Sequence, residues 1–147
     1  MNRFRTIALA TMICVAAPAA VVHAAAAPKP KTLTPDQLKW VPSTAAPGVM
    51  TATAWGDPAK GPHGAFHKFP AGFTAALHTH SANARIVVLS GTMVLAGKDG
   101  KEMKFPPGSF YTEPKTFNHV TKCMPESECM VYLQADGKWD LIPDAKP

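Results

Sequence analysis

Three histidines are the residues of this sequence whose type and spacing best suit metal chemistry. His78 and His80 lie two positions apart at the start of an apolar run that ends at Gly91. Alternate side chains of a β-strand share a face, so both imidazoles are expected on one side, roughly 7 Å apart along the chain. A third histidine, His119, begins another apolar run after a proline-marked turn. Neutral imidazole is a common ligand for Zn, Fe, Cu and Ni, so the three are candidate metal ligands, although each alone could be an ordinary surface or core histidine.

The segments that must position these histidines are short strands. From Val49 onward, alternating apolar and polar runs are interrupted by Gly, Pro and Asp, and no stretch has a helical period. Many short strands in so small a domain are typical of an all-β sandwich or barrel. The predicted strands are Val49–Ala54, Ala65–Phe69, Thr74–His80, Arg85–Leu89, Thr92–Ala96, Glu102–Phe105, Ser109–Glu113, Asn118–Lys122 and Cys129–Gln134.

Glycine and proline residues frame the histidines at fixed spacings. Five residues lead from Gly72 to His78; three residues then separate His80 from Ala84, and six separate Ala84 from Gly91. In the second segment, "GSFYTEPKTFNH", five residues separate the glycine from the proline and four separate the proline from the histidine. These spacings resemble the two signature motifs of the cupin superfamily, G-x5-H-x-H-x3-E-x6-G and G-x5-P-x-G-x2-H-x3-N.

The resemblance covers roughly Trp55 to Trp139, and it is closest in character to small exported single-domain cupins of unassigned function. It implies an all-β, cupin-type jelly roll, a double-stranded β-helix barrel with a metal inside it. Residues 49–143 are then the barrel domain, and His78, His80 and His119 occupy the family's histidine-ligand positions. The resemblance implies one divalent metal ion as cofactor, with Fe(II) favoured and Zn, Mn, Ni or Cu as alternatives.

The family's glutamate ligand is replaced here by Ala84. Three imidazoles with open positions can still serve a catalytic metal. Without the carboxylate the metal is expected to be electron-poor and to bind an enolate, thiolate or carboxylate more readily. Glu113, on the strand before the third histidine, either approaches the site as an acid or ends an edge strand in solvent. Gln134, late in the last strand, is a candidate hydrogen-bond partner for a ligand or for the substrate.

Two further pairs of residues have alternative interpretations. His63 and His67 lie four apart on one face of a strand and are interpreted as an exposed or internally satisfied pair, with His67 as a stand-in metal ligand in the alternative interpretation. Cys123 and Cys129 flank the turn "MPESE". In an exported protein this arrangement indicates a disulfide that clamps a hairpin. Free or buried thiols and metal ligation are the alternatives for the cysteines.

The N-terminus has the layout of a secretory signal peptide. Residues 1–24 begin with Arg3 and Arg5, continue in an apolar stretch from Ile7 to Val22, and end in small residues. Export to the periplasm or the extracellular space is therefore predicted, with no stable membrane anchor. A transmembrane segment is the alternative, but the run is marginal in length and is followed at once by Ala, Pro and Lys. Residues 25–48, rich in Pro and Ala, are predicted as an N-terminal arm on the barrel.

Composition limits the possible partners. Without Arg3 and Arg5, 13 of the 15 basic residues remain against 10 acidic ones, a formal net charge of +3. The basic residues are scattered and form no stripe with interleaved aromatics, so no nucleic-acid partner is expected. A small-molecule ligand or substrate is expected instead. The resemblance to cupins further implies that the protein forms a homodimer.

Three functions remain open from the sequence. The first is a metal-dependent oxidoreductase of dioxygenase type, acting with Fe(II) on a small enolisable or thiol substrate. The second is a non-catalytic cupin that binds a metal or a small ligand, which the missing glutamate favours. The third is an inert scaffold without a metal.

Overall fold

The computed structural model describes residues 29–144. The described residues from Thr32 onward form one compact unit, which holds all of the described strands. The predicted signal peptide, residues 1–24, lies outside the described residues. Within them, no helix has the length and the hydrophobicity that crossing a membrane requires.

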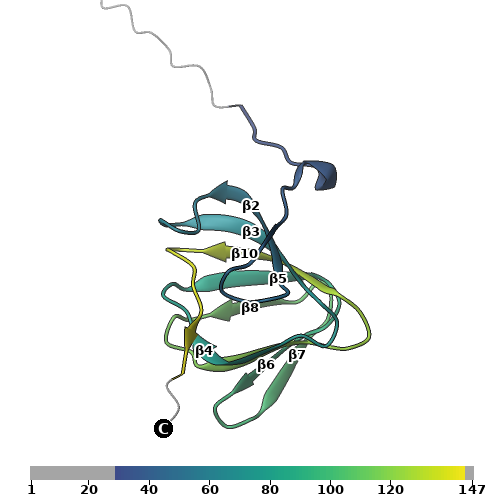
Figure 1. Ribbon diagram of the computed structural model, residues 1–147, viewed down its shortest axis with the longest axis vertical. Coiled ribbons are helices and arrows are strands. Elements are labelled where there is room, and N and C mark those ends of the chain that lie inside the picture. The colour runs from purple at the N-terminus through teal and green to yellow at the C-terminus, as the bar shows by residue number, and fades with distance from the viewer. Residues whose placement is uncertain (1–28, 145–147) are drawn as a thin grey trace, which may run out of the picture. The chain divides into compact units, whose positions relative to one another are not determined.

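Two antiparallel sheets face each other and enclose the core of this unit (Figure 1). Every strand pair within them is antiparallel, so the predicted all-β jelly roll is confirmed. The six-stranded sheet has the order β1 (Val41–Pro42), β2 (Met50–Gly56), β3 (His63–Phe69), β10 (Cys129–Ala135), β5 (Ala84–Ser90) and β8 (Phe110–Glu113). The five-stranded sheet has the order β11 (Ile142–Pro143), β4 (Thr74–Thr79), β9 (His119–Cys123), β6 (Met93–Gly97) and β7 (Glu102–Phe105).

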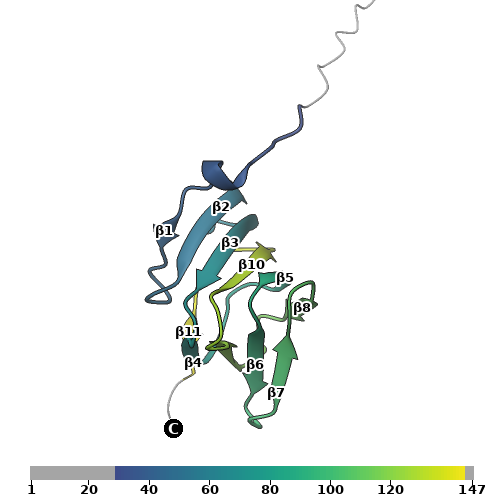
Figure 2. The ribbon, with the colours of Figure 1, turned by 90° about the vertical axis from the view of Figure 1, so that its right-hand side faces the viewer.

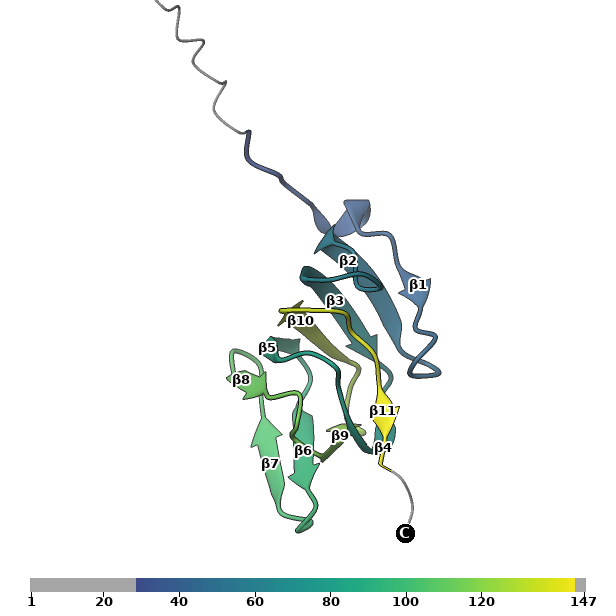
Figure 3. The ribbon, with the colours of Figure 1, turned by 90° about the vertical axis from the view of Figure 1, so that its left-hand side faces the viewer.

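The strands agree with the sequence pattern to within two residues at each end, with two additions. β1 lies beside β2 at the edge of the larger sheet (Figure 2), and β11 lies beside β4 at the edge of the smaller one (Figure 3). Each has two residues and includes a proline, so neither has an alternation that a sequence pattern can reveal. A 3-10 turn, Pro35–Gln37, occupies the position where a short helical turn is expected, and the backbone N–H of Thr34 donates to Gln37 Oε1 over 2.9 Å.

The core lies between the sheets and follows strand alternation. In β5, Ala84, Ile86 and Val88 are buried, whereas Arg85 and Leu89 are exposed. Full burial of a side chain such as that of Ile86 or Val88 stabilises the fold by about 1.5–3 kcal/mol. The other large apolar side chains of this core are Met93, Leu95, Val131 and Leu133.

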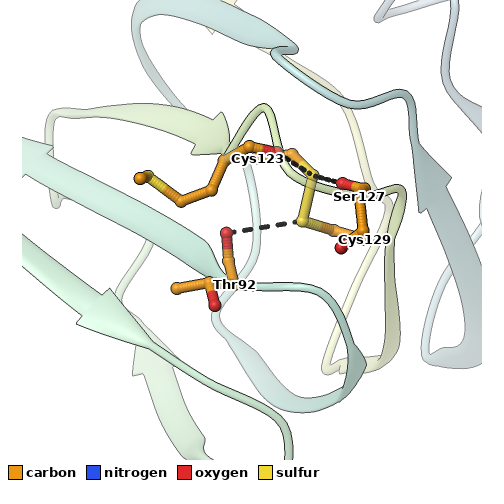
Figure 4. The surroundings of a disulfide bond; sticks show 5 residues. Thr92, Cys123, Ser127 and Cys129 are labelled. Carbon is orange, nitrogen blue, oxygen red and sulfur yellow. Dashed lines mark hydrogen bonds between the residues drawn. A yellow bond between two sulfur atoms is a disulfide. The ribbon is translucent and has the colours of Figure 1, made fainter.

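A disulfide between Cys123 and Cys129 joins the end of β9 to the start of β10 (Figure 4). Both cysteines are buried, and Cys129 Sγ lies 3.4 Å from the carbonyl oxygen of Thr92. Gly91 packs against the same corner with φ +68°, and a Cβ there would lie 2.6 Å from the Glu128 carbonyl oxygen and 2.7 Å from Cys129 Sγ. The motif glycine is therefore required both by its backbone conformation and by the close approach of this hairpin.

Reduction of this disulfide should lower the free energy of unfolding by about 2 kcal/mol, because the unfolded chain regains the freedom of the short loop that the bond closes. Urea unfolding with and without reductant measures the change. The double variant Cys123→Ala, Cys129→Ala is the control and should not respond to reductant. Equal stability of the wild type in both conditions would contradict the prediction.

Candidate metal centre

The fold brings the three predicted histidines together between the sheets. His78 of β4 lies directly opposite His119 of β9, and His80 follows one residue after β4 ends. All three are buried, and their nearest ligand nitrogens lie within 4.8 Å of one another. Two ligands of one ion with bonds of about 2.1 Å lie roughly 3–4 Å apart. The three imidazoles can therefore hold a single ion after small side-chain movements.

Backbone carbonyls set the tautomer of each histidine. In all three rings Nδ1 contacts a carbonyl oxygen, which can only accept a hydrogen bond, so Nδ1 carries the proton and donates it. The lone pair of Nε2 is then free to bind a metal, and the ring is held in orientation by the same bond. The acceptors are the carbonyl oxygens of Ala76 for His78, Phe117 for His119 and Asp140 for His80.

Burial keeps these imidazoles neutral. Desolvation lowers the pKa of His78 and of His119, and it lowers the pKa of His80 to about 3. Neutral imidazole is the form that binds metals. The Nε2 of His119 is fully buried and has no hydrogen-bond partner among the described residues, a condition that costs about 1–3 kcal/mol unless a ligand satisfies it. A metal ion would satisfy it.

A carboxylate does lie in this cluster, and it comes from a different strand. Glu113 of β8 is directly opposite Ala84 of β5. Its carboxylate oxygens lie 3.4 Å from His119 Nε2 and 3.7 Å from His80 Nε2, spacings that suit ligands of a common ion. The expectation that no carboxylate lies at the site is therefore corrected, because Glu113 lies beside two of the three histidines. The small side chain of Ala84 leaves room for that of its cross-strand neighbour.

The environment of Glu113 favours a neutral side chain when no cation is present. The residue is 5 % exposed, and burial raises its pKa to about 8. Tyr111, two residues earlier on the same face, is also buried, and its pKa is raised by burial and by the nearby Glu113. A divalent cation among the four side chains would offset the cost of burying the carboxylate.

A mostly apolar cavity begins at this cluster and extends through the core. Its walls include Ile86 and Leu133 from one sheet and Met93 from the other. Two further segments contribute to its lining. They are the end of the N-terminal arm with the residue that follows it, through Ser43, Ala45, Ala46 and Val49, and the C-terminal segment, through Trp139, Asp140 and Leu141.

Two residues of the C-terminal segment, Trp139 and Asp140, make contacts beside the histidine cluster. The Trp139 ring stacks on His80 with centroids 3.8 Å apart. The Asp140 carboxylate accepts hydrogen bonds from the backbone N–H and the hydroxyl of Ser81, at 2.9 and 2.6 Å. These contacts cover one side of the site and limit access of water to it.

The other sequence candidates lie elsewhere. Gln134 is exposed, and the alternation of β10 turns it to the opposite face from Leu133, so the role predicted for it beside a ligand or the substrate is corrected. The cysteines are joined to each other rather than placed at the cluster. His63 and His67 are neither exposed nor satisfied, since Nε2 of each is buried without a partner among the described residues. His67 lines the cavity but does not belong to the three-histidine group.

Comparison with known proteins agrees with this architecture. Residues 29–142 match the family model described as "Domain of unknown function (DUF4437)". The polyketide cyclase RemF from Streptomyces resistomycificus has a similar structure with a TM-score of 0.67 and 18% identity, covering 81% of this chain and 88% of that one. No curated protein sequence matches the chain.

Two RmlC-like cupins are also similar. The one from Ralstonia eutropha has a TM-score of 0.62 and 20% identity, over 77% of this chain and 72% of that one. The one from Shewanella frigidimarina has a TM-score of 0.58 and 14% identity, over 74% and 91%. The fold is therefore that of the cupins, as the motif spacing predicts.

The pKa of Glu113 predicts how the stability of the metal-free protein depends on pH. Folded protein keeps a proton on Glu113 up to about pH 8, whereas the unfolded chain loses it near the ordinary glutamate pKa of 4.5. This group therefore makes the free energy of unfolding fall as the pH rises through that window. The lowered histidine pKa values have the opposite effect, but only below about pH 6.5.

Between pH 6.5 and 8, the free energy of unfolding of the metal-free wild type should therefore fall, by up to about 2 kcal/mol. Urea unfolding in the presence of a chelator measures it. The Glu113→Gln variant should show a flat profile in this range. An equal decline in both proteins would assign the effect to another group.

Proposed function

The chain belongs to the family described as "Domain of unknown function (DUF4437)" and has the cupin fold, and on this basis we propose that it holds one divalent metal ion through three histidines and a glutamate. The ligands are His78, His80, His119 and Glu113. The observation that carries the proposal is the convergence of a buried carboxylate on two buried Nε2 atoms, at 3.4 and 3.7 Å. Buried charges in proteins are paired or coordinate metals.

Fe(II) is the favoured ion. Imidazole suits Fe, Zn, Cu and Ni, and a carboxylate extends the set to Mn. Both cysteines in the described part of the chain are joined in the disulfide, so neither offers a thiolate that would select a softer metal. Held by these four side chains, such an ion would supply Lewis-acid chemistry towards a substrate oxygen. Backbone carbonyl oxygens orient the histidine ligands by accepting hydrogen bonds from their Nδ1 atoms. The apolar walls of the cavity exclude water from the site.

The enzymatic form of the proposal is a dioxygenase-type oxidoreductase that acts on a small enolisable or thiol substrate. For a 1,3-diketone, the reaction would consume one dioxygen and break the bond between the central carbon and one carbonyl carbon. The products would be a carboxylic acid and a 2-oxoaldehyde, so that the diketone is oxidised and dioxygen is reduced. The apolar cavity supports a neutral organic substrate of this type.

The second candidate function is binding of a metal or small ligand without turnover. One observation favours it, because every imidazole and carboxylate of the cluster would serve as a ligand. The remaining nearby carboxylate, of Asp140, is already hydrogen bonded to Ser81. No side chain of the cluster is then left as a general base, and the substrate itself would have to lose its proton on binding.

Export remains a prediction, with one supporting observation. Disulfides form and persist in oxidising compartments and are rare in the cytosol. The Cys123–Cys129 bond therefore supports the export that the N-terminal residues predict. A homodimer also remains a prediction.

Alanine at any one of His78, His119 or Glu113 should weaken metal binding by at least about 100-fold, since loss even of groups that only orient ligands costs 10- to 100-fold. Metal analysis after equilibration with Fe(II) or Zn(II) measures the loss. Glu126→Ala, at an exposed glutamate in a turn, is the matched control and should bind like the wild type.

The double variant Ala84→Glu, Glu113→Ala tests the role of Glu113 most directly. It moves the carboxylate across one strand pair, from β8 to β5, and should restore much of the affinity that Glu113→Ala loses. Full affinity in the single variant Glu113→Ala would contradict the assignment of this residue as a ligand.

Wild-type protein loaded with Fe(II) under anaerobic conditions should consume dioxygen when a 1,3-diketone or a thiol from a small panel is added. An oxygen electrode measures the uptake, and Glu113→Ala should abolish it. Stoichiometric iron without uptake for any compound would favour the binding function over the enzyme.

A further inference from the structure

His67 adds a further polar side chain to the lining of the cavity that begins at the histidine cluster. His67 lies on β3, whose inward face carries the buried residues His63 and Ala65, whereas Phe66 packs against Tyr132 on the outer face. His67 lines the cavity together with Phe69 and Val131. The rings of His67 and Phe69 are stacked, with their centroids 6.3 Å apart.

The Nε2 of His67 has no hydrogen-bond partner among the described residues, although it is fully buried. Leaving such an atom unpaired costs about 1–3 kcal/mol, and native structures rarely retain one without a reason. His63 has a buried Nε2 as well, but its Nδ1 donates to the Gly61 carbonyl and the residue does not line the cavity. His67 is thus the unpartnered imidazole that a ligand in this cavity would meet.

Strand register places His67 well away from the metal ligands. Glu113 is in the cross-strand row of Ala84, Ala135 and His63, whereas His67 is in the row of Val131. The two rows are four residues apart along β3, which corresponds to roughly 13 Å. Apolar side chains line the cavity between the rows, among them Ile86 and Leu133.

The charge of the cavity restricts the group that His67 would bind. No lysine or arginine is among the described residues that line it. Burial lowers the pKa of His67 to about 4, so its ring is neutral at pH 7. The Nε2 atom of a neutral imidazole is a donor or an acceptor according to its tautomer and can pair with a hydroxyl or, as a donor, with a carbonyl, whereas a carboxylate would have no cation to pair with.

We propose that His67 is the distal anchor of the small-molecule site, where it hydrogen bonds a neutral hydroxyl or carbonyl group of an elongated, mostly apolar ligand. The opposite end of that ligand binds the metal centre, so this proposal rests on the proposed metal site. The ligand class is therefore a neutral aryl or alkyl compound with a metal-binding oxygen head and one polar group at the far end. A compound without the far polar group leaves His67 unpaired.

Two pairs of 1,3-diketones test this with the zinc-loaded full chain, in which no oxidation occurs. The first pair is 1-phenylbutane-1,3-dione and its 4-hydroxyphenyl analogue; the second replaces phenyl by biphenyl, with the hydroxyl on the outer ring. Calorimetry should show that the hydroxyl tightens binding about 5- to 10-fold in at least one pair, the value of one net hydrogen bond.

The variants separate this role from a purely structural one. His67→Phe should abolish the advantage of the hydroxyl while leaving the zinc content and the affinity for the parent diketone unchanged. His67→Gln, which keeps a donor and an acceptor, should retain part of the advantage.

Bound zinc without an advantage of the hydroxyl in either pair would overturn the distal anchor alone. An advantage that persists in His67→Phe would do the same. Wild-type protein that binds no zinc would contradict the proposed metal site, and this proposal with it.

Discussion

The burial of three imidazoles and one carboxylate at a single point between two sheets is the constraint on which the rest of this structure depends. Each of these groups prefers water, and each is held in the core with Nε2 or a carboxylate oxygen directed to the same place. Desolvation lowers the histidine pKa values and raises that of Glu113, so that the cluster without a cation is close to neutral. Binding a divalent cation would use the lone pairs that burial leaves free.

The position of the Glu113 carboxylate follows from cross-strand pairing in the larger sheet. Directly opposite residues of an antiparallel pair have Cβ atoms about 5 Å apart, close enough for a long side chain on either strand to reach the same point. Ala84 and Glu113 are such a pair. Ala84 stands on β5 where the cupin motif has a glutamate, and this small residue makes room for the Glu113 side chain from β8.

Segments outside the central strands shape the remainder of the site. The C-terminal segment supplies the carbonyl that orients His80 and the ring that covers it. The N-terminal arm closes another part of the cavity. The disulfide and Gly91 fix the opposite end, where β9 turns towards β10, and so hold the strand that carries His119. Access to the histidine cluster and the shape of the cavity are therefore determined by parts of the chain with little periodic pattern.

The sequence by itself determined the strands, the three histidines and the glycine frame, because alternation and motif spacing are local properties of the chain. It could not reveal that Glu113 lies beside the histidines, since the pairing of Ala84 with Glu113 depends on the register between distant strands. Gln134 was a candidate partner of a ligand or of the substrate, but the pleat of β10 turns this residue outward. The sequence also could not tell that His67 faces a cavity rather than solvent, because a cavity exists only after two sheets and two terminal segments have packed around it. Those placements were decided by the tertiary structure, because only the packing of distant segments determines which side chains are buried at the same place.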